Sequence, residues 1–390
     1  MSNKMKKRYL TVFFYKTMDK VFLYKDTGSI AYGLAKYHNY KASFGYLDIC
    51  GEIKDVEYEK YVELLPIKYH NNIFIKWKNI IVFIWKMAKK YDVINFYFGG
   101  RQEMLLALVA KISNSKVKIY VKMDLLKKFY HNQINSEMNI KLSIKHMLVA
   151  ILSFAVDLYT VECSAYVQEL NKLKRFSGKI KYLTNGFFSD LVKFDREISK
   201  EKIILTVGRI GTVEKNTEML VEAIKLINQD KIQEWKVYLV GPVTNEFKIW
   251  YEKELEERPY LKTIFVMTGN ISNKKKLYEI YAKSSVFVLT SRWESWGLVL
   301  VEAAHFKNYT IVTDCCDSFR EFIIDGDRGF GKIIPNENVG ELKIALEDVL
   351  DNKVDYNQKG NLAGKFVDER FDWKLITKQL KEYLEGVYNG

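Results

Sequence analysis

Two glutamates, eight positions apart, are the first residues in this sequence whose types and spacing could do chemistry. Glu294 follows Arg292 and Trp293, whereas Glu302 lies within "GLVLVEAA", which is otherwise apolar. A buried carboxylate is costly unless hydrogen-bond donors compensate it, and the paired hydroxyls of a sugar are such donors. Glu302 is therefore a candidate for binding sugar hydroxyls. The alternative is a core glutamate bonded to neighbouring backbone or to an arginine, and this segment alone does not separate the two.

The segment before Glu302 predicts a strand, a loop and a helix in succession. Residues 284–290, "SSVFVLT", are typical of a strand, and the helix is expected to begin near Gly297. Such a junction directs free backbone N–H groups at a ligand, and the helix dipole favours negative charge there. Gly297 would also let a ligand approach the backbone closely. The junction therefore suits a phosphate group.

A second strand–helix junction carries two cations. In "ILTVGRIGTVEKNTEMLVEA", Arg209 and Lys215 lie after a predicted strand and before a predicted helix. Arg forks onto phosphate oxygens, and Lys supplies a mobile point charge. Solvated loop cations are the alternative for any single pair of this kind. Two junctions in one domain, one with cations and one with a helix N-terminus, together favour a diphosphate ligand.

The elements that must position these residues alternate between short apolar runs and helical patterns. At 390 residues the chain is long for one core, so two domains are expected. The alternation predicts an α/β protein made of two Rossmann-like, doubly wound domains that face a central cleft. The expected strands are 9–15, 92–98, 116–122, 156–162, 202–208, 235–241, 263–269, 284–290 and 309–314.

The boundary between the domains is expected close to Asn185 and Gly186, a turn signal followed by a polar stretch. The predicted domains are 1–190 and 191–371. Residues from about 372 to 390 form an amphipathic pattern typical of a final helix.

The charge is placed unevenly along the chain. Residues 1–195 contain 32 Lys and Arg against 17 Asp and Glu, so the whole excess of the +13 chain lies there. A basic surface predicts an anionic partner, either nucleic acid or a membrane, and solvated lysines are the alternative. The four cysteines lack ligand spacing, which indicates a reduced, cytosolic setting without disulfides. No signal peptide and no transmembrane helix are expected.

Three segments together resemble a known family. "VGRI…EKN", "GNISNKKKLYEIYAKSSVFVLTSRWESWGLVLVEAA" and "REFIIDGDRGF" look like the retaining glycosyltransferases of family 4, which have the GT-B fold. The E-x7-E spacing of Glu294 and Glu302 is the signature of that family. The match rests on the order and spacing of the segments over residues 203–330, and the N-terminal half matches only in its general pattern.

The resemblance implies a role for each matching position on the donor side. Glu302 would bind the ribose hydroxyls, and Glu294 would face the hydroxyls of the transferred sugar and act in catalysis. Asn185 resembles the family's interdomain Asn-Gly element, and the final helix, from about 372 to 390, would pack back onto the N-terminal domain. The other implied donor-binding residues are Arg209 and Lys215 at the diphosphate, Gly297 and Leu298 through their amides, Asn270 and Ile271 beside the nucleobase, Trp296, and Gly28 in a first loop that faces the cleft.

The acceptor side is less well matched. Asp124, at a strand end in "YVKMDLLKKFYHN", is a candidate catalytic or acceptor-side residue, and a solvated helix-cap Asp is the alternative. His131 lies further along the same segment. Gly99, Gly100 and Arg101 follow another predicted strand and are also expected on the acceptor side.

No catalytic metal and no cofactor are predicted. The "DGD" at 325–327 looks like a metal-binding motif, but its neighbours are typical of a tight turn. Fixed cations and helix amides would stabilise the leaving diphosphate instead. The sugar would keep its anomeric configuration through attack on the same face.

The segment 71–92 combines an apolar stripe with many lysines. It predicts either a basic helix resting on an anionic membrane or an ordinary outer helix of the first domain. Its apolar residues are Ile80, Ile81, Ile84, Trp85 and Ala88, and its lysines include Lys76, Lys78, Lys86, Lys89 and Lys90.

The function predicted from these features is that of a hexosyltransferase-type retaining glycosyltransferase in the cytoplasm, peripheral on the inner face of the plasma membrane. It would move a sugar from a nucleotide sugar, with UDP favoured by family frequency, to a glycan or lipid-linked acceptor in cell-surface polysaccharide or glycoconjugate synthesis. Nucleic acid is not an expected partner, because no binding motif accompanies the charge. The alternatives are a non-catalytic GT-B partner subunit, a transferase acting on a protein-linked glycan, and an epimerase or phosphorylase on the same fold.

Overall fold

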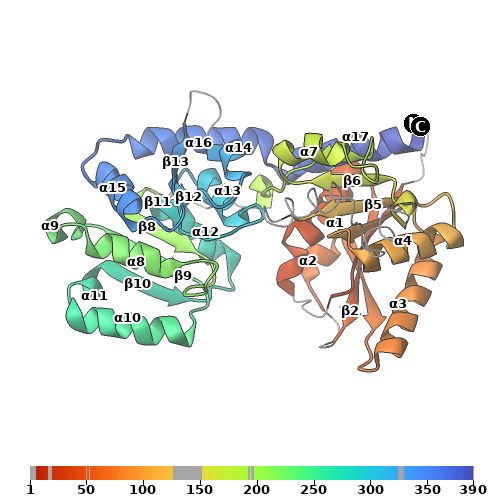
Figure 1. Ribbon diagram of the computed structural model, residues 1–390, viewed down its shortest axis with the longest axis horizontal. Coiled ribbons are helices and arrows are strands. Elements are labelled where there is room, and N and C mark those ends of the chain that lie inside the picture. Colours follow the sequence, from red (N-terminus) through yellow and green to blue (C-terminus); the bar gives the residue numbers. More distant parts are fainter. Residues whose placement is uncertain are drawn as a thin grey trace. The chain divides into compact units, whose positions relative to one another are not determined.

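Two parallel sheets organise the chain (Figure 1). Contacts divide it into unit 1, which comprises Met1–Gly186 with Trp373–Gly390, and unit 2, which is Phe187–Asp372. One boundary thus follows the turn at Asn185, and the final helix belongs with the N-terminal unit. The computed structural model describes residues 6–15, 20–49, 51, 53–125, 152–191, 194, 197–323 and 329–389.

The sheet of unit 1 has the strand order β3-β2-β1-β4-β5-β6-β7, and all of its strand pairs are parallel. The carboxyl ends of the strands therefore meet at one edge. The strands are β1 (Arg8–Phe13), β2 (Lys41–Asp48), β3 (Val62–Lys68), β4 (Val93–Tyr97), β5 (Lys118–Met123), β6 (Leu158–Val161) and β7 (Ile180–Tyr182).

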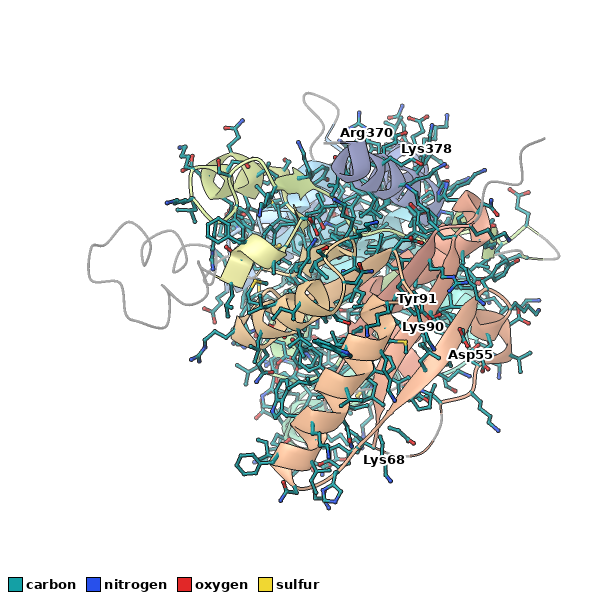
Figure 2. All side chains as sticks on the ribbon, turned by 90° about the vertical axis from the view of Figure 1, so that its right-hand side faces the viewer. Asp55, Lys68, Lys90, Tyr91, Arg370 and Lys378 are labelled. Atoms are coloured by element: carbon teal, nitrogen blue, oxygen red, sulfur yellow. The ribbon has the colours of Figure 1, made fainter. Side chains whose placement is uncertain are left out.

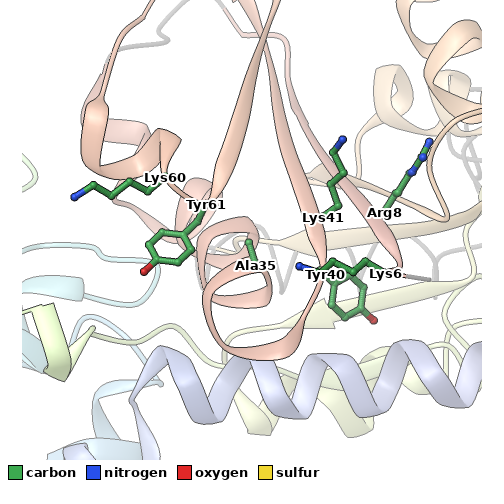
Figure 3. A pocket seen from close by; sticks show the side chains of 7 residues that line it. All are labelled: Lys6, Arg8, Ala35, Tyr40, Lys41, Lys60 and Tyr61. Atoms are coloured by element: carbon green, nitrogen blue, oxygen red, sulfur yellow. The ribbon is translucent and has the colours of Figure 1, made fainter. Parts of the chain in front are cut away.

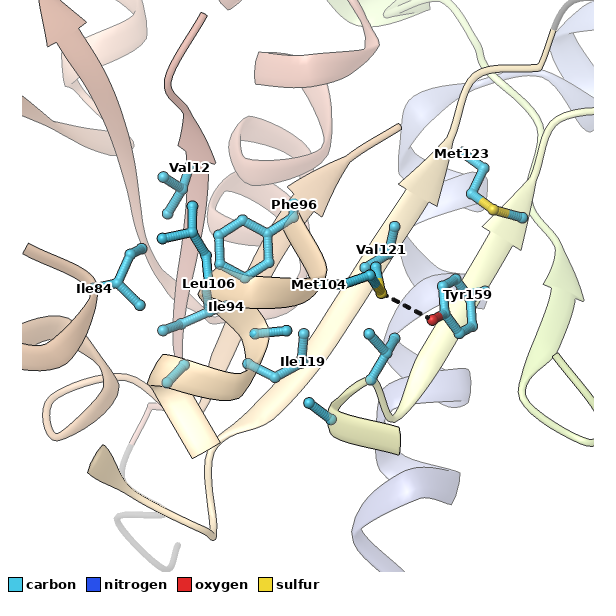
Figure 4. Close-up of a cluster of buried hydrophobic side chains, with 14 of the residues drawn as sticks. Val12, Ile84, Ile94, Phe96, Met104, Leu106, Ile119, Val121, Met123 and Tyr159 are labelled. Carbon is cyan, nitrogen blue, oxygen red and sulfur yellow. Dashed lines mark hydrogen bonds between the residues drawn. The ribbon is translucent and has the colours of Figure 1, made fainter. Parts of the chain in front are cut away.

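Helices cover both faces of this sheet, as expected of a doubly wound domain. On one face, Ile94, Phe96 and Val121 pack against Met104 and Leu106 (Figure 4). The other face meets the first and last helices of the chain. The helices and turns of unit 1 are η1 (Lys20–Leu23), α1 (Asp26–His38), α2 (Val56–Glu59), α3 (Ile73–Ala88), α4 (Arg101–Ser113), η2 (Ser153–Ala155), α7 (Ser164–Asn171) and α17 (Trp373–Asn389).

The last helix is tied to unit 1 by close packing against α1. A Cβ on Gly33 would lie 2.8 Å from Cγ2 of Thr377, so the two helices approach at a position that only glycine tolerates. The ring nitrogen Nε2 of His38 lies 3.1 Å from Oγ1 of Thr377. Residues 373–389 therefore complete the first unit although they end the chain.

Unit 2 has a six-stranded parallel sheet in the order β10-β9-β8-β11-β12-β13. Neighbouring residues of one strand face opposite cores: Ile204 joins one apolar cluster and Leu205 the other. The strands are β8 (Glu201–Val207), β9 (Lys236–Val240), β10 (Phe265–Gly269), β11 (Ser284–Leu289), β12 (Tyr309–Thr313) and β13 (Gly331–Ile334). The helices and turns are η3 (Ser189–Leu191), α8 (Thr217–Lys225), α9 (Gln229–Ile232), α10 (Asn245–Glu257), α11 (Leu261–Ile264), α12 (Lys274–Lys283), α13 (Leu298–His305), α14 (Phe319–Ile323), α15 (Val339–Leu350) and α16 (Tyr356–Arg370).

The predicted α/β architecture of two doubly wound sheets is confirmed, and every strand expected from the sequence is present. Four strands were not predicted: β2, β3, β7 and β13. β2 contains Ser43 and Gly45, and the edge strand β3 contains Glu63 and Pro66, so neither has a continuous apolar run. The other two are only 3 and 4 residues long.

Candidate functional site

The strand order of unit 2 reverses between β8 and β11, which lie side by side at the centre of the sheet. In open parallel sheets, ligands bind beyond the carboxyl ends of the strands at such a switch point. Two loops begin there: residues 208–216 lead from β8 into α8, and residues 290–297 lead from β11 into α13. These loops carry most of the residues predicted to bind the donor.

Hydrogen bonds join the two loops. The Thr290 hydroxyl donates to the carbonyl oxygens of Lys215 (3.0 Å) and Asn216 (2.9 Å). The backbone N–H of Arg292 donates to the carbonyl oxygen of Glu214 at 2.8 Å. The Arg292 guanidinium adds a further bond between the loops, to the carbonyl oxygen of Val213 at 2.6 Å.

Lys215 and Glu294 form an ion pair across the switch point, between Nζ and Oε1. Both side chains are mostly buried, with 17% and 14% of their surface exposed, respectively. The Ser291 hydroxyl donates to the same carboxylate oxygen at 2.7 Å. A Cβ on Gly208 would lie 3.5 Å from Cε of Lys215, so the lysine passes over the end of β8. A cation and a carboxylate are therefore paired at the carboxyl edge of the sheet, and binding of a diphosphate and its sugar at this pair stays a prediction.

The other predicted diphosphate cation is more exposed. The Arg209 guanidinium pairs with the Glu214 carboxylate at 2.6 Å, and two-thirds (66%) of its side chain is exposed. A ligand phosphate could replace the Glu214 carboxylate as the partner of the guanidinium at little cost in free energy, because exposed ion pairs are weak.

The start of α13 depends on Gly297. Its φ of +82° is left-handed, and a Cβ there would lie 2.7 Å from Cε1 of Phe319. Only glycine therefore tolerates both this backbone conformation and the close approach of the Phe319 ring. Leu298 follows as the first residue of the helix, and N–H groups in a first turn lack carbonyl partners within the helix. The strand–loop–helix junction expected from the sequence is thus present in unit 2, and its binding of phosphate stays a prediction.

Trp296 is buried. Its ring is 1% exposed and packs edge-on against Phe322 at 5.1 Å and Phe371 at 5.9 Å. Trp296 was predicted to bind the donor; its side chain packs in the core, and donor binding at this position stays a prediction. The ring is buried because the residue before Gly297 faces inward, where α14 and the end of α16 form an aromatic cluster.

Glu302 lies on α13 and is partly buried. The Tyr281 hydroxyl donates to its Oε2 at 3.0 Å, and no other hydrogen bond from the described residues reaches this carboxylate. Burial raises the pKa of Glu302, while the charge of Lys274 and the Tyr281 hydrogen bond oppose the rise. One hydrogen bond uses only part of the accepting capacity of a carboxylate, so Glu302 can still accept hydrogen bonds from ligand hydroxyls.

The remaining residues predicted to bind the donor are divided between the two units. Asn270 and Ile271 follow β10, where Asn270 is exposed and Ile271 packs against the apolar cluster that also contacts Leu298. Gly28 lies in unit 1, in the first turn of α1, and its carbonyl oxygen accepts a hydrogen bond from the Tyr58 hydroxyl at 2.9 Å. Gly28 is therefore not among the residues that the loops of unit 2 bring together.

The acceptor-side candidates lie at the carboxyl edge of the unit 1 sheet. Gly99 and Gly100 follow β4, with φ +70° at Gly99, and Arg101 is the exposed first residue of α4. Asp124 follows β5, the neighbouring strand. His131 lies outside the described residues, as does the "DGD" at 325–327.

A buried charged pair at this same edge was missed by the sequence reasoning. Lys122 of β5 donates to Glu162, directly after β6, at 3.1 Å. A signal was present, because Lys122 lies within a short apolar run and Glu162 directly follows another.

A hollow of about 420 Å³ opens at the opposite edge of the unit 1 sheet (Figure 3). Its position at the amino ends of β1 and β2 separates it from the acceptor-side candidates. The lining residues are Lys6, Arg8, Ala35, Tyr40, Lys41, Lys60 and Tyr61.

Comparisons with known proteins agree with this arrangement. Residues 189–366 match the family model described as "Glycosyl transferases group 1". An α-1,4-N-acetyl-D-galactosaminyltransferase of Campylobacter jejuni is 29% identical over 158 residues, which are 40% of this chain and 41% of that protein. The mannosylfructose-phosphate synthase of Agrobacterium fabrum is 22% identical over 347 residues, which cover 83% of this chain and 75% of that protein.

Solved structures share the fold of the whole chain. The Anabaena protein HepE, solved in complex with UDP, superposes with a TM-score of 0.73 at 14% identity and covers 98% of this chain and 100% of its own. The resemblance to GT-B glycosyltransferases is thereby confirmed. Residues 189–366, which contain every predicted donor-binding residue except Gly28, are thus similar to the group 1 glycosyltransferases.

Proposed function

We propose that the chain is a hexosyltransferase-type retaining glycosyltransferase, which transfers a sugar from a UDP-sugar to a glycan or lipid-linked acceptor in cell-surface polysaccharide or glycoconjugate synthesis. The observation that carries the proposal is the Lys215–Glu294 pair at the switch point of unit 2. It places a fixed cation and a carboxylate beside the N-terminus of α13, which itself bears Glu302.

Each group has a distinct task in the proposed reaction. Lys215 and Arg209, with the amides of Gly297 and Leu298, stabilise the charge that develops on the departing diphosphate. Glu302 binds the ribose hydroxyls, and Glu294 orients the hydroxyls of the transferred sugar. The acceptor hydroxyl attacks the anomeric carbon from the face that the diphosphate leaves, the bond from that carbon to the diphosphate breaks, and the hydroxyl proton passes to the departing phosphate oxygen, so the configuration is retained. These protein groups supply the charge stabilisation, and no metal or cofactor takes part in the proposal.

Two relatives support the choice of substrates. The Anabaena structure with the same fold contains UDP. The name of the Campylobacter enzyme gives its acceptor as a saccharide linked to undecaprenol through a diphosphate. Because the match covers 41% of that enzyme, the acceptor is carried over here only as the class of lipid-linked glycans.

Calorimetric titration of the full chain with UDP, GDP and a panel of their sugars, in the presence of EDTA, tests the proposal. We expect one nucleotide sugar to bind, and NMR of the product to show a retained anomeric configuration. Inversion would refute the retaining mechanism. Binding of none of the candidates would instead favour a non-catalytic GT-B partner subunit.

We further propose that α3 contacts an anionic membrane surface. The helix contains no acidic residue and exposes large apolar side chains, including Phe74 (82% exposed) and Trp85 (41%). Figure 2 looks onto this side of unit 1, with Lys68 and Lys90 labelled near the two ends of the helix. No helix in the described parts of the chain is long and apolar enough to cross a bilayer. Exposed apolar groups interleaved with lysines favour a position at the lipid headgroups.

Neutralising two exposed lysines of α3 and Lys89, which directly follows it, should release the protein from anionic vesicles. Each basic residue near such a surface contributes about 1 kcal/mol, so Lys78→Gln, Lys86→Gln and Lys89→Gln together should weaken binding by about two orders of magnitude. Sedimentation with vesicles of phosphatidylglycerol and phosphatidylcholine at low salt measures this. The matched control replaces Lys248, Lys253 and Lys262, three exposed lysines of unit 2, by Gln. Equal losses in both variants, or no binding by the wild type, would refute α3 as the contact.

A further inference from the structure

The hollow at the amino ends of β1 and β2 is rich in basic side chains (Figure 3). Its described lining includes Lys6, Arg8, Lys41 and Lys60 and contains no acidic residue. All four basic residues are exposed, so a solute can reach them directly. The volume of about 420 Å³ falls within the range of sites that bind small molecules. The size and the charge of the hollow together favour a small anionic ligand.

The sheet holds two of these cations side by side. Arg8 and Lys41 are partners in the parallel register of β1 and β2, so their side chains leave the same face of the sheet from adjacent strands. Figure 3 shows both side chains extending in the same direction. Lys6 lies two positions before Arg8 and lines the same hollow. Like charges at neighbouring positions repel one another, and an anion bound among them would remove that repulsion.

Acidic side chains compensate part of this charge. Glu57 pairs with Lys60, at 2.6 Å between Oε1 and Nζ. Asp92 accepts a hydrogen bond from the backbone N–H of Arg8 at 2.7 Å. The Arg8 guanidinium itself donates only to the carbonyl oxygen of Lys90, at 3.4 Å, among its hydrogen bonds to described residues. Lys60 is therefore neutralised by the chain, whereas the Arg8 guanidinium keeps most of its donors.

Lys6 and Lys41 carry charge that stays unpaired. Neither ammonium group takes part in an ion pair or a hydrogen bond within the described part of the chain. The C-terminal turn of α1 borders the hollow at Ala35, and its dipole favours cations, but Lys36 already occupies that turn. An anion from outside the chain is therefore the partner that the two ammonium groups lack.

We propose that the hollow binds the phosphate group of a small organic phosphate through Lys6, Arg8 and Lys41. A guanidinium forks onto two phosphate oxygens, and ammonium groups add point charges. The Tyr61 ring, which is 41% exposed, offers an apolar wall to the carbon body of the ligand. Soluble phosphate esters and phospholipid headgroups share this chemistry, and experiment separates the two sources. The site does not depend on the proposed transferase reaction, because it lies at the opposite edge of the sheet from the acceptor-side candidates.

Calorimetric titration of the full chain with sn-glycerol 3-phosphate tests for a soluble ligand. The hollow variant, Lys6→Gln with Lys41→Gln, should bind about tenfold more weakly or worse, because two charge-assisted contacts are lost. The matched control, Lys116→Gln with Lys181→Gln, removes the same charge from exposed positions of unit 1 outside the hollow and should bind like the wild type. Lys215→Met should also bind like the wild type. Binding that is lost in Lys215→Met but kept in the hollow variant would assign the probe to unit 2 and overturn the proposal.

Sedimentation with vesicles of phosphatidylglycerol and phosphatidylcholine tests for a lipid headgroup. If the ligand is a lipid, the hollow variant should bind these vesicles about tenfold more weakly than the control variant, although the lysines of α3 are intact in both. Each variant should melt within about 2 °C of the wild type, since the replaced residues are exposed. The proposal is wrong if the wild type binds neither probe, or if the hollow variant and the control lose the same affinity.

Discussion

Lys215→Met is expected to lower the rate of sugar transfer by about 100- to 1,000-fold, the usual cost of removing one group that stabilises a departing oxyanion. The ammonium is fixed by Glu294 and by its path over Gly208, so it needs no rearrangement when charge develops on the diphosphate. The effect should fall mainly on kcat, because the charge is largest in the transition state. The measurement is the initial rate at which UDP is released from the nucleotide sugar that calorimetry identifies.

Lys202→Met is the control, because Lys202 lies near the opposite end of β8 and pairs with Glu234 at the surface. Lys215→Arg keeps a cation and should restore part of the rate. A melting temperature for each variant separates catalysis from stability, since Lys215→Met leaves Glu294 without its partner. A rate within about threefold of the wild type for folded Lys215→Met would contradict the role of this lysine.

Glu302→Ala is expected to weaken the binding of UDP by about 10- to 100-fold, the range for hydrogen bonds to a charged group. The carboxylate has one described partner, Tyr281, and its remaining lone pairs are proposed to meet the ribose. Titration with UDP and with 2′-deoxy-UDP measures the contact. The wild type should prefer UDP, and the variant should bind both alike. Equal preference in wild type and variant would contradict the ribose contact.

The pH dependence of UDP binding gives an independent check on Glu302. Burial raises its pKa above the ordinary value, so it takes up a proton at a higher pH than an exposed glutamate. Its contribution to binding should be lost as the pH falls through the raised pKa. Glu302→Gln cannot titrate and should lack this acidic loss. Tyr281→Phe removes the hydrogen bond that orients Glu302, and should show a smaller loss of affinity than the alanine variant.

Much of the donor side was predictable because its signals are local. Glu294, Gly297 and Glu302 lie within one strand–loop–helix, and Arg209 and Lys215 lie within another. Parallel strands place their carboxyl ends at one edge, so two such junctions in one sheet had to meet. The alternation of elements likewise predicted both sheets.

The tertiary structure alone decided what each side chain touches. Lys215 and Glu294 are 79 residues apart, and no sequence pattern announces their pairing. Trp296 and Glu302 lie in the same motif. The Trp296 ring lies in the core, whereas the Glu302 carboxylate keeps capacity for further hydrogen bonds. Lys122, Glu162 and Asn185 come from three separate strand ends, and the fold joins them by hydrogen bonds. Sequence thus determined the order of elements and the residues at their ends, because backbone geometry is local. Burial and partner choice depend on how distant segments pack, and only the folded chain fixes them.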